Sequence, residues 1–324
     1  MSDRKRKPSQ RRASSSTSSY RAPSRREPEP PRSFLDRFAR PPGTSPMPRI
    51  RTSFTRGVTV VLATPALVAA VPVLILVAWI GLVAVGFQGP FALLASTFAV
   101  PPISTEMDIS LAGVFAQAGR TGFGAAFGPL LGLTGFIVLS AAVQAIVTTA
   151  SIERLRTGGV SSWTARRAVH VLPVTVGVGI ANLGILILAG IGRLFGAGLG
   201  LLLAIGVLVA GVYFFAFAPA IAADEDHPLP FTMAKSIRAA RMPGSNNLLL
   251  AALVVVPSFA ILSATGFNAI PGSTIDVNPS IGAWVTVILL NLLHAAVVAT
   301  FAFRYLAVAH AVPEPAAATG RGRR

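Results

Sequence analysis

Residues 222–243 read AADEDHPLPFTMAKSIRAARMP and separate two long apolar runs, residues 194–222 and 247–267. The stretch begins with an acidic run at 224–226, continues through two prolines and ends in a basic amphipathic segment. A membrane-spanning helix needs about 20 largely apolar residues, so each flanking run is long enough to cross a bilayer. We therefore expect the stretch to be a short polar connection between two membrane spans.

The composition is that of an integral membrane protein with a basic extension. Of the 324 residues, 52% are apolar and only 12% are charged, whereas soluble domains carry about a quarter charged residues. The first 56 residues hold 15 of the 28 Lys and Arg, and the net charge of +16 favours an anionic surface as a partner. Arginine outnumbers lysine 25 to 3, a bias typical of GC-rich bacterial genomes. The chain has no cysteine, which excludes disulfides and thiolate chemistry.

Six apolar runs predict an all-α, polytopic membrane domain over residues 57–310. Residues 1–56 are too polar and proline-rich to bury a core, and we expect a disordered basic tail. Residues 311–324 are expected to form a second, short basic tail. The prolines within the first and fifth runs predict kinked helices. The runs are about 58–87, 123–150, 171–191, 194–222, 247–267 and 281–306.

The distribution of Lys and Arg predicts the orientation of the spans. With the N-terminus in the cytoplasm, 11 basic residues beyond the tail lie on the inner side, and only Arg120 and Arg193 on the outer side. The chain is thus predicted to be a multi-pass protein of the cytoplasmic (plasma) membrane with both termini in the cytoplasm. Residues 88–120 are predicted to be either a re-entrant or interfacial segment or an ordinary outer loop.

A shift of 68 residues aligns the two inner loops and places Trp163 on Phe231 and Arg167 on Lys235. Each loop is predicted to be a short interfacial helix whose aromatic and basic face contacts lipid headgroups or a partner protein. The same shift predicts that spans two and three repeat as spans four and five. The expected contact residues are Trp163, Arg166, Arg167, Phe231, Lys235, Arg238 and Arg241.

Small and polar residues within the spans form two further sets. Glycines one turn apart predict close helix packing, and they are Gly124, Gly128, Gly132, Gly192, Gly196 and Gly200. The intramembrane polar residues are Gln144, Asn182, Asn291 and His294. Asn291 and His294 share a helix face, which predicts either a functional site or an interhelical hydrogen bond.

No sequence motif predicts a metal, a cofactor or catalysis. The run at 224–227, Asp-Glu-Asp-His, places four consecutive side chains in different directions, so a polar loop before a helix N-terminus is favoured over a metal site. The chain contains no motif of a zinc protease, a serine hydrolase or a phosphate-binding loop. We therefore expect a protein that is not an enzyme and needs no cofactor.

Residues 217–239 resemble the inner loop after the fourth span in the six-span membrane domains fused to some glycerophosphodiester phosphodiesterases, and in related uncharacterised bacterial membrane proteins. The matching positions are Asp226, Pro228 or Pro230, Ala234 and Ser236. Residues 159–168 resemble the earlier loop of the same group, and the likeness covers roughly residues 58–310. The resemblance implies the architecture without hydrolysis, because no phosphodiesterase catalytic domain is present.

These observations predict a non-enzymatic scaffold or lipid-interacting module whose partners are anionic headgroups at the cytoplasmic face. A protein partner or a second copy of the chain stays open, and a nucleic-acid partner is not expected. The alternative is a transporter or permease component for a small solute, favoured by the repeat, the kinked spans and the pair Asn291 and His294. An intramembrane enzyme ranks third, for want of a nucleophile with its base.

Overall fold

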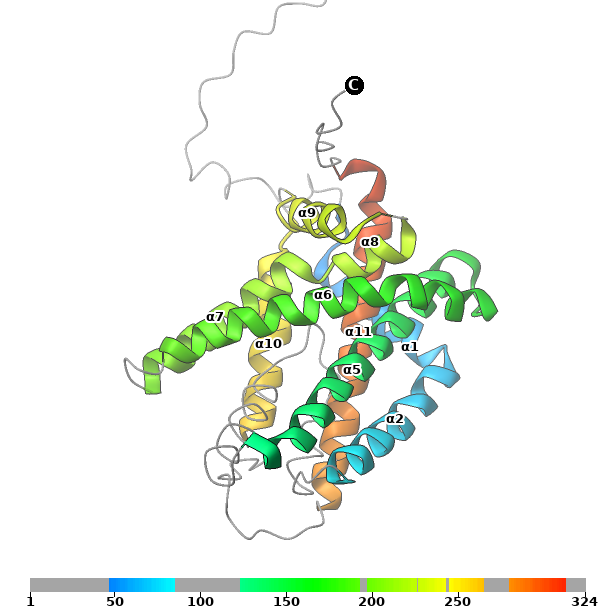
Figure 1. Ribbon diagram of the computed structural model, residues 1–324. Coiled ribbons are helices and arrows are strands. Elements are labelled where there is room, and N and C mark those ends of the chain that lie inside the picture. The colour runs from blue at the N-terminus through cyan, green and yellow to red at the C-terminus, as the bar shows by residue number, and fades with distance from the viewer. Residues whose placement is uncertain are drawn as a thin grey trace, which may run out of the picture. The chain divides into compact units, whose positions relative to one another are not determined.

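Long helices make up most of the described chain. The computed structural model describes residues 47–84, 123–192, 197–225, 227–242, 245–264 and 280–312, all within one unit, Pro41–Arg324. Regular structure in these ranges is helical throughout (Figure 1). The helices are α1 (Ile50–Leu62), α2 (Pro65–Ala84), α5 (Phe123–Thr157), α6 (Ser162–Gly192), α7 (Ala197–Phe215), α8 (Ala218–Asp224), α9 (Leu229–Ala240), α10 (Asn247–Ala264) and α11 (Ile281–Val308), followed by the 3-10 turn η3 (Ala309–Ala311).

Three helical segments of the described chain are long and apolar enough to cross a membrane: Val138–Thr157, Ile205–Asp224 and Ile281–Ala311. A fourth crossing results if α1 and α2, which meet at a bend of 79°, form one broken span. The expected all-α fold with membrane-spanning helices is confirmed at this level, with three to four candidate crossings among the described residues.

Large apolar side chains also cover outward faces of these helices. Val73, Val77 and Ile80 on α2, Leu202 on α7 and Leu289 on α11 are each more than half exposed. Exposed apolar faces of this kind are unfavourable in water and suit contact with lipid chains.

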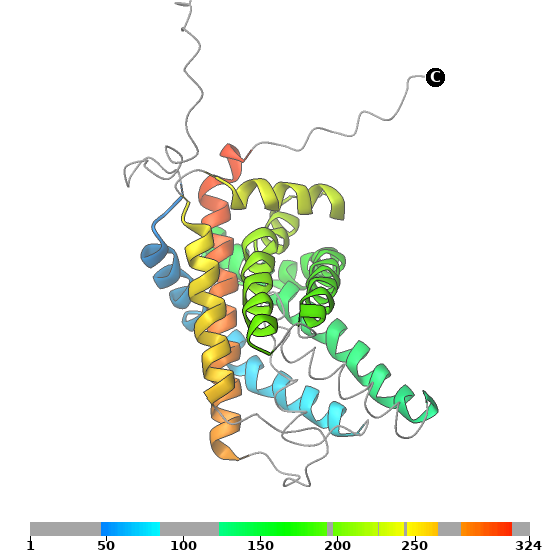
Figure 2. The same ribbon diagram turned by 90° about the vertical axis from the view of Figure 1, so that its left-hand side faces the viewer.

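Helix α11 occupies the middle of the packing. It contacts α1, α2, α5 and α8, and its residues 294–302 are all buried. Phe301 meets Phe217, in the turn before α8, edge to face with ring centroids 5.1 Å apart. Elsewhere α6 packs on α5 and α7, and α10 packs on α7. Figure 2 shows α9 lying across the end of the bundle where α11 finishes.

The contact between α1 and α11 is unusually close because α1 carries Gly57 on its buried face. A Cβ atom at this position would overlap the Thr300 hydroxyl and the Ala296 carbonyl oxygen, and would lie 2.8 Å from the Thr300 backbone nitrogen. Glycine is therefore the residue that lets the two helices approach to this distance.

The helical body begins earlier than the sequence predicted. Met47 and Ser53 are buried and α1 begins at Ile50, although residues 47–56 were assigned to the disordered tail. The physical reason is that α1 buries small residues, such as Ser53 and Gly57, and turns its arginines outward. The composition of residues 47–56 is therefore polar although the segment packs against the body. The structure does not describe residues 1–46, 85–122 and 313–324. The expectations for the two tails and for the outer segment 88–120 therefore stay predictions there.

Two further boundaries differ from prediction. The first run is broken more sharply than a proline kink predicts: it bends by 79° at Ala63 and Thr64, just before Pro65, and the two helices form either one broken span or a re-entrant segment. The first inner loop does not form a separate interfacial helix either. Residues 162–170 are the beginning of α6, which continues through Pro173 as one 31-residue helix. Only the second loop forms a separate short helix, α9, of 12 residues.

Replacing Gly57 by Ala should destabilise the protein by about 1–3 kcal/mol, because the added methyl group displaces α1 from α11. The matched control is Gly81→Ala in α2, where a Cβ atom meets nothing within 4 Å. That variant should be neutral or slightly stabilising, because alanine favours helix more than glycine does. Thermal unfolding in detergent measures both, and equal melting temperatures for the two variants would contradict the close contact.

Candidate functional site

The charged side chains of the described residues gather at one end of the bundle, which we call the polar end. It comprises the beginning of α1, the turn between α5 and α6, the segment from α8 to α10 and the last turns of α11 (Figure 1). The three carboxylates of the described ranges all lie there, and they are Glu153, Asp224 and Glu225.

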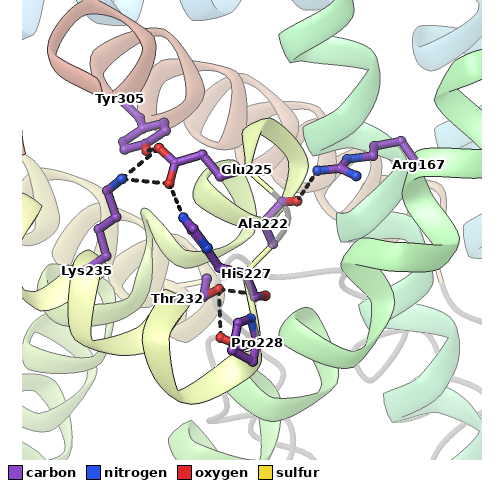
Figure 3. Close-up of polar contacts among 8 residues, drawn as sticks. All are labelled: Arg167, Ala222, Glu225, His227, Pro228, Thr232, Lys235 and Tyr305. Carbon is purple, nitrogen blue, oxygen red and sulfur yellow. Dashed lines mark hydrogen bonds and ion pairs between the residues drawn. The ribbon is translucent and has the colours of Figure 1, made fainter. Parts of the chain in front are cut away.

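Glu225 is the centre of a polar cluster that joins three helices (Figure 3). Lys235 of α9 donates to both carboxylate oxygens, at 2.8 Å and 2.6 Å, and its side chain is only 4% exposed. The Tyr305 hydroxyl of α11 donates to the same carboxylate, and His227 Nε2 lies 2.9 Å from Oε2. The cluster therefore fastens the turn after α8 to both α9 and α11.

These partners decide the charge state of Glu225. Burial alone would raise the pKa of its carboxyl group, but the hydrogen bonds from Lys235 and Tyr305, with the charges of Lys235 and His227, outweigh burial. The pKa of Glu225 therefore lies below its ordinary value of 4.5, and the group is a carboxylate at neutral pH.

The end of α8 is also held from α5 and α6. Arg167 Nε donates to the Ala223 carbonyl at 3.0 Å, and its Nη2 donates to the Ala222 carbonyl at 3.2 Å. A cation at a helix C-terminus is favourable, because the last carbonyl groups lack partners within the helix. Arg156 of α5 forms an ion pair with Asp224. Arg167 and Lys235, which the 68-residue shift aligned, thus both act on residues 222–225.

Glu153 closes the turn between α5 and α6. It accepts hydrogen bonds from the hydroxyls of Ser161 and Thr164, and Ser161 Oγ in turn accepts from the Trp163 backbone nitrogen at 3.2 Å. Gly158 has a φ of 77°, a conformation that favours glycine, and it allows the chain to reverse here. The turn fixes where α6 begins, and with it the position of Trp163.

A second cluster surrounds Arg304, which is fully buried in α11. Its Nη2 and Nε donate to Asn247 Oδ1, at 2.8 Å and 3.2 Å. Its Nη1 donates to the Pro48 carbonyl at 2.7 Å and to Ser53 Oγ at 3.3 Å, and the Ser245 carbonyl accepts from Nη2. We call these five residues the Arg304 hub. Its acceptors among the described residues are all neutral.

The Arg304 hub reaches α9 through Asn247. Asn247 Nδ2 donates to the Ala239 carbonyl at 3.3 Å and to the Ala240 carbonyl at 3.2 Å, at the end of α9. The sequence alone does not predict this role, because Arg304 counts there only as one of the basic residues on the inner side. A single arginine at the end of an otherwise apolar span was the one available signal.

The seven predicted contact residues divide into two groups. Trp163 is 41% exposed, and Arg166 and Arg241 are exposed as well. The other four turn inward or are half-buried: Lys235 and Arg167 make the contacts described above, Phe231 lies against His227 with ring centroids 4.2 Å apart, and Arg238 is half-buried.

Two of the predicted intramembrane polar residues line the same cavity. Gln144 of α5 and Asn291 of α11 are buried and line one cavity of about 20 Å³, which is room for about one water molecule. His294 is buried one turn further along α11. The side chain of Asn182 in α6 lies outside the description, and the transport hypothesis stays a prediction.

The predicted glycine contacts lie largely outside the description. Gly124, Gly128, Gly132, Gly192 and Gly200 are placed in helices, but the packing around them is not described, and Gly196 falls between the described ranges. Among the described residues, no group of three or more His, Asp or Glu could hold a metal ion.

Replacing Glu225 by Gln should lower the stability of the protein at neutral pH by up to about 3 kcal/mol, because Lys235 stays buried and charged without its carboxylate. The pKa of Glu225 is lowered in the fold, so its stabilisation is present above about pH 4.5 and is lost as the pH falls through the folded pKa. The difference in melting temperature between the wild type and Glu225→Gln should therefore shrink in acid. A Glu225→Gln/Lys235→Met double variant should recover part of the loss, and a loss equal to that of the single variant would refute the pairing.

Replacing Arg304 by Met should cost about 3 kcal/mol or more, because the Ser245 carbonyl loses its Arg304 donor and the Pro48 carbonyl keeps only the long hydrogen bond from Ser53 Oγ, at 3.5 Å, among the described residues. Hydrogen exchange should show faster exchange of the α1 amides. Arg51→Met, on the exposed face of α1, is the control and should change stability by less than about 0.5 kcal/mol. Unchanged exchange in Arg304→Met would show that the Arg304 hub does not hold α1.

No family model matches the chain, and neither a curated protein nor a solved structure matches it. The resemblance to six-span membrane domains therefore stays a prediction.

Proposed function

We propose that this chain is a non-enzymatic, lipid-interacting scaffold of the cytoplasmic membrane, with its polar end at the cytoplasmic face. In this proposal the six predicted runs all cross the bilayer and both termini are cytoplasmic, as in the six-span domains that the sequence resembles. The partners are the anionic headgroups of the membrane.

The proposal is supported mainly by the excess of exposed cations, together with an exposed tryptophan, at the polar end. The described ranges contain eleven Lys and Arg against three Asp and Glu. All three carboxylates are engaged by neighbouring side chains. Trp163 and Arg166 are therefore left exposed together in the first turns of α6. Arg241, after α9, is exposed as well and lies over the Phe214 ring. Basic residues at the ends of spans favour the cytoplasmic side, and tryptophan favours the headgroup region.

Packing supports a scaffold more than a catalyst. Glu225, His227 and Lys235 are the polar residues most suited to chemistry. Lys235 and His227 both contact the Glu225 carboxylate, and these contacts fasten helices to one another. Such a network fixes the shape of the polar end, and the outward face is what it presents to other molecules.

The triple variant Trp163→Ala/Arg166→Gln/Arg241→Gln should retain several-fold less anionic lipid, because each arginine near an anionic surface is worth about 1 kcal/mol. The measurement is mass spectrometry of lipids that copurify from discs holding equal amounts of phosphatidylglycerol and phosphatidylcholine. The control is Trp163→Phe/Arg166→Lys/Arg241→Lys, which keeps the charge and the aromatic ring. Equal enrichment of phosphatidylglycerol in the triple variant and the wild type would contradict the proposal.

A further inference from the structure

A groove of about 460 Å³ lies at the polar end between α1, α5 and α11. Its volume falls within the usual range of ligand sites, about 300–1,000 Å³. Two arginines contribute to its lining, Arg56 from α1 and Arg154 from α5. The two come from helices that are far apart in the sequence and are brought together only by the fold.

The rest of the lining is largely apolar. Val60 of α1, Leu155 of α5, and Phe303 and Leu306 of α11 form the wall. The polar residue Thr59 donates its hydroxyl to the Thr55 carbonyl at 2.8 Å, within α1. The groove therefore combines two strong hydrogen-bond donors with a hydrocarbon surface.

The positive charge of the groove is not balanced by the described part of the chain. No carboxylate lines it. Glu153, next to Arg154 in the sequence, turns to Ser161 and Thr164 instead. Asp224 pairs with Arg156, and Glu225 pairs with Lys235. In the described ranges, no ion pair or hydrogen bond involves the side chain of Arg56 or that of Arg154.

We infer that this groove binds one anionic phospholipid, whose phosphate contacts Arg56 and Arg154 and whose acyl chains follow the apolar wall. The inference rests on the proposed lipid-interacting function and gives that function a defined site. Guanidinium groups match phosphate oxygens in geometry and charge, and basic pockets between membrane helices are suited to anionic headgroups. The apolar wall favours a lipid over a water-soluble anion, because only a lipid covers both surfaces.

The site is held in shape by contacts that do not touch the ligand. The Arg304 hub fixes the beginning of α1 through Pro48 and Ser53, and Gly57 seats the next turn directly on α11. Arg56 is adjacent to Gly57 in the sequence, so its backbone position is set by this contact. A preformed site loses less entropy on binding than one that must assemble.

The test is native mass spectrometry of the full chain released from discs that contain phosphatidylglycerol and phosphatidylcholine in equal amounts. The wild type should retain one phosphatidylglycerol molecule through graded delipidation. In Arg56→Gln/Arg154→Gln the affinity for this molecule should fall about 30-fold, from about 1 kcal/mol per arginine. Arg56→Lys/Arg154→Lys should recover part of the affinity. Melting temperatures close to that of the wild type show that each variant is folded.

The charge-matched control is Arg49→Gln/Arg51→Gln, which removes two exposed arginines of the same region outside the groove. It should retain the bound lipid as the wild type does. Equal retention by Arg56→Gln/Arg154→Gln, or equal retention of phosphatidylcholine by the wild type, would overturn the groove site. If Arg56→Gln/Arg154→Gln keeps the bound lipid while Trp163→Ala/Arg166→Gln/Arg241→Gln loses general phosphatidylglycerol enrichment, the groove site is wrong but the proposed function stands. If Arg56→Gln/Arg154→Gln loses the bound lipid while Trp163→Ala/Arg166→Gln/Arg241→Gln keeps general enrichment, the proposed function of the outer face is wrong.

Discussion

A buried arginine, Arg304, whose acceptors among the described residues are all neutral, imposes the main constraint on this structure. Removing a guanidinium group from water is costly unless its donors are satisfied. Around Arg304 they are satisfied by neutral oxygens from two places along the chain, residues 48–53 and residues 245–247. Asn247 in turn donates to the end of α9. Each of these segments must therefore be in position for α11 to pack as it does. The beginning of the described chain and its last long helix are joined at this point.

The second layer of organisation depends on the end of α8. Arg156, Arg167, Lys235 and Tyr305, from four different helices, all contact residues 222–225. The arrangement satisfies the orphan carbonyl groups of the helix and neutralises both carboxylates. It also pairs two of the three described carboxylates of the polar end with cations, while Glu153 is held by hydroxyl groups. The cations that remain, on the outward face and in the groove beside α1, are the ones available to an anionic partner.

Much of the helical framework could be predicted, because it depends on local properties of the sequence. Helix α11 begins at the predicted residue, Ile281, and ends two residues beyond the predicted Leu306. Helix α10 begins at Asn247, as expected. Apolar length and polar flanks determine these boundaries, and both can be read without knowledge of the partners. Proline likewise marked the bend before Pro65, although its size could not be read from the sequence.

The contacts that shape the site could not be predicted in the same way. Arg304 lies 256 residues from Pro48 along the chain, and no periodicity indicates that the two meet. The 68-residue shift aligned Arg167 with Lys235, but helix faces alone do not say which face turns inward. The lining of the groove depends on the close packing of α1 on α11 at Gly57, in a segment whose composition is that of a tail.

The central claim is that the Arg304 hub seats α1 against α11 and thereby forms a lipid site at Arg56 and Arg154. A cryo-EM map of the full chain in discs containing phosphatidylglycerol tests it most directly. The account predicts Arg304 density that reaches the Pro48 and Ser245 carbonyl groups, with α1 packed on α11 and headgroup density beside Arg56 and Arg154. A map in which α1 is separated from α11, with Arg304 facing lipid or water and the groove absent, would contradict it.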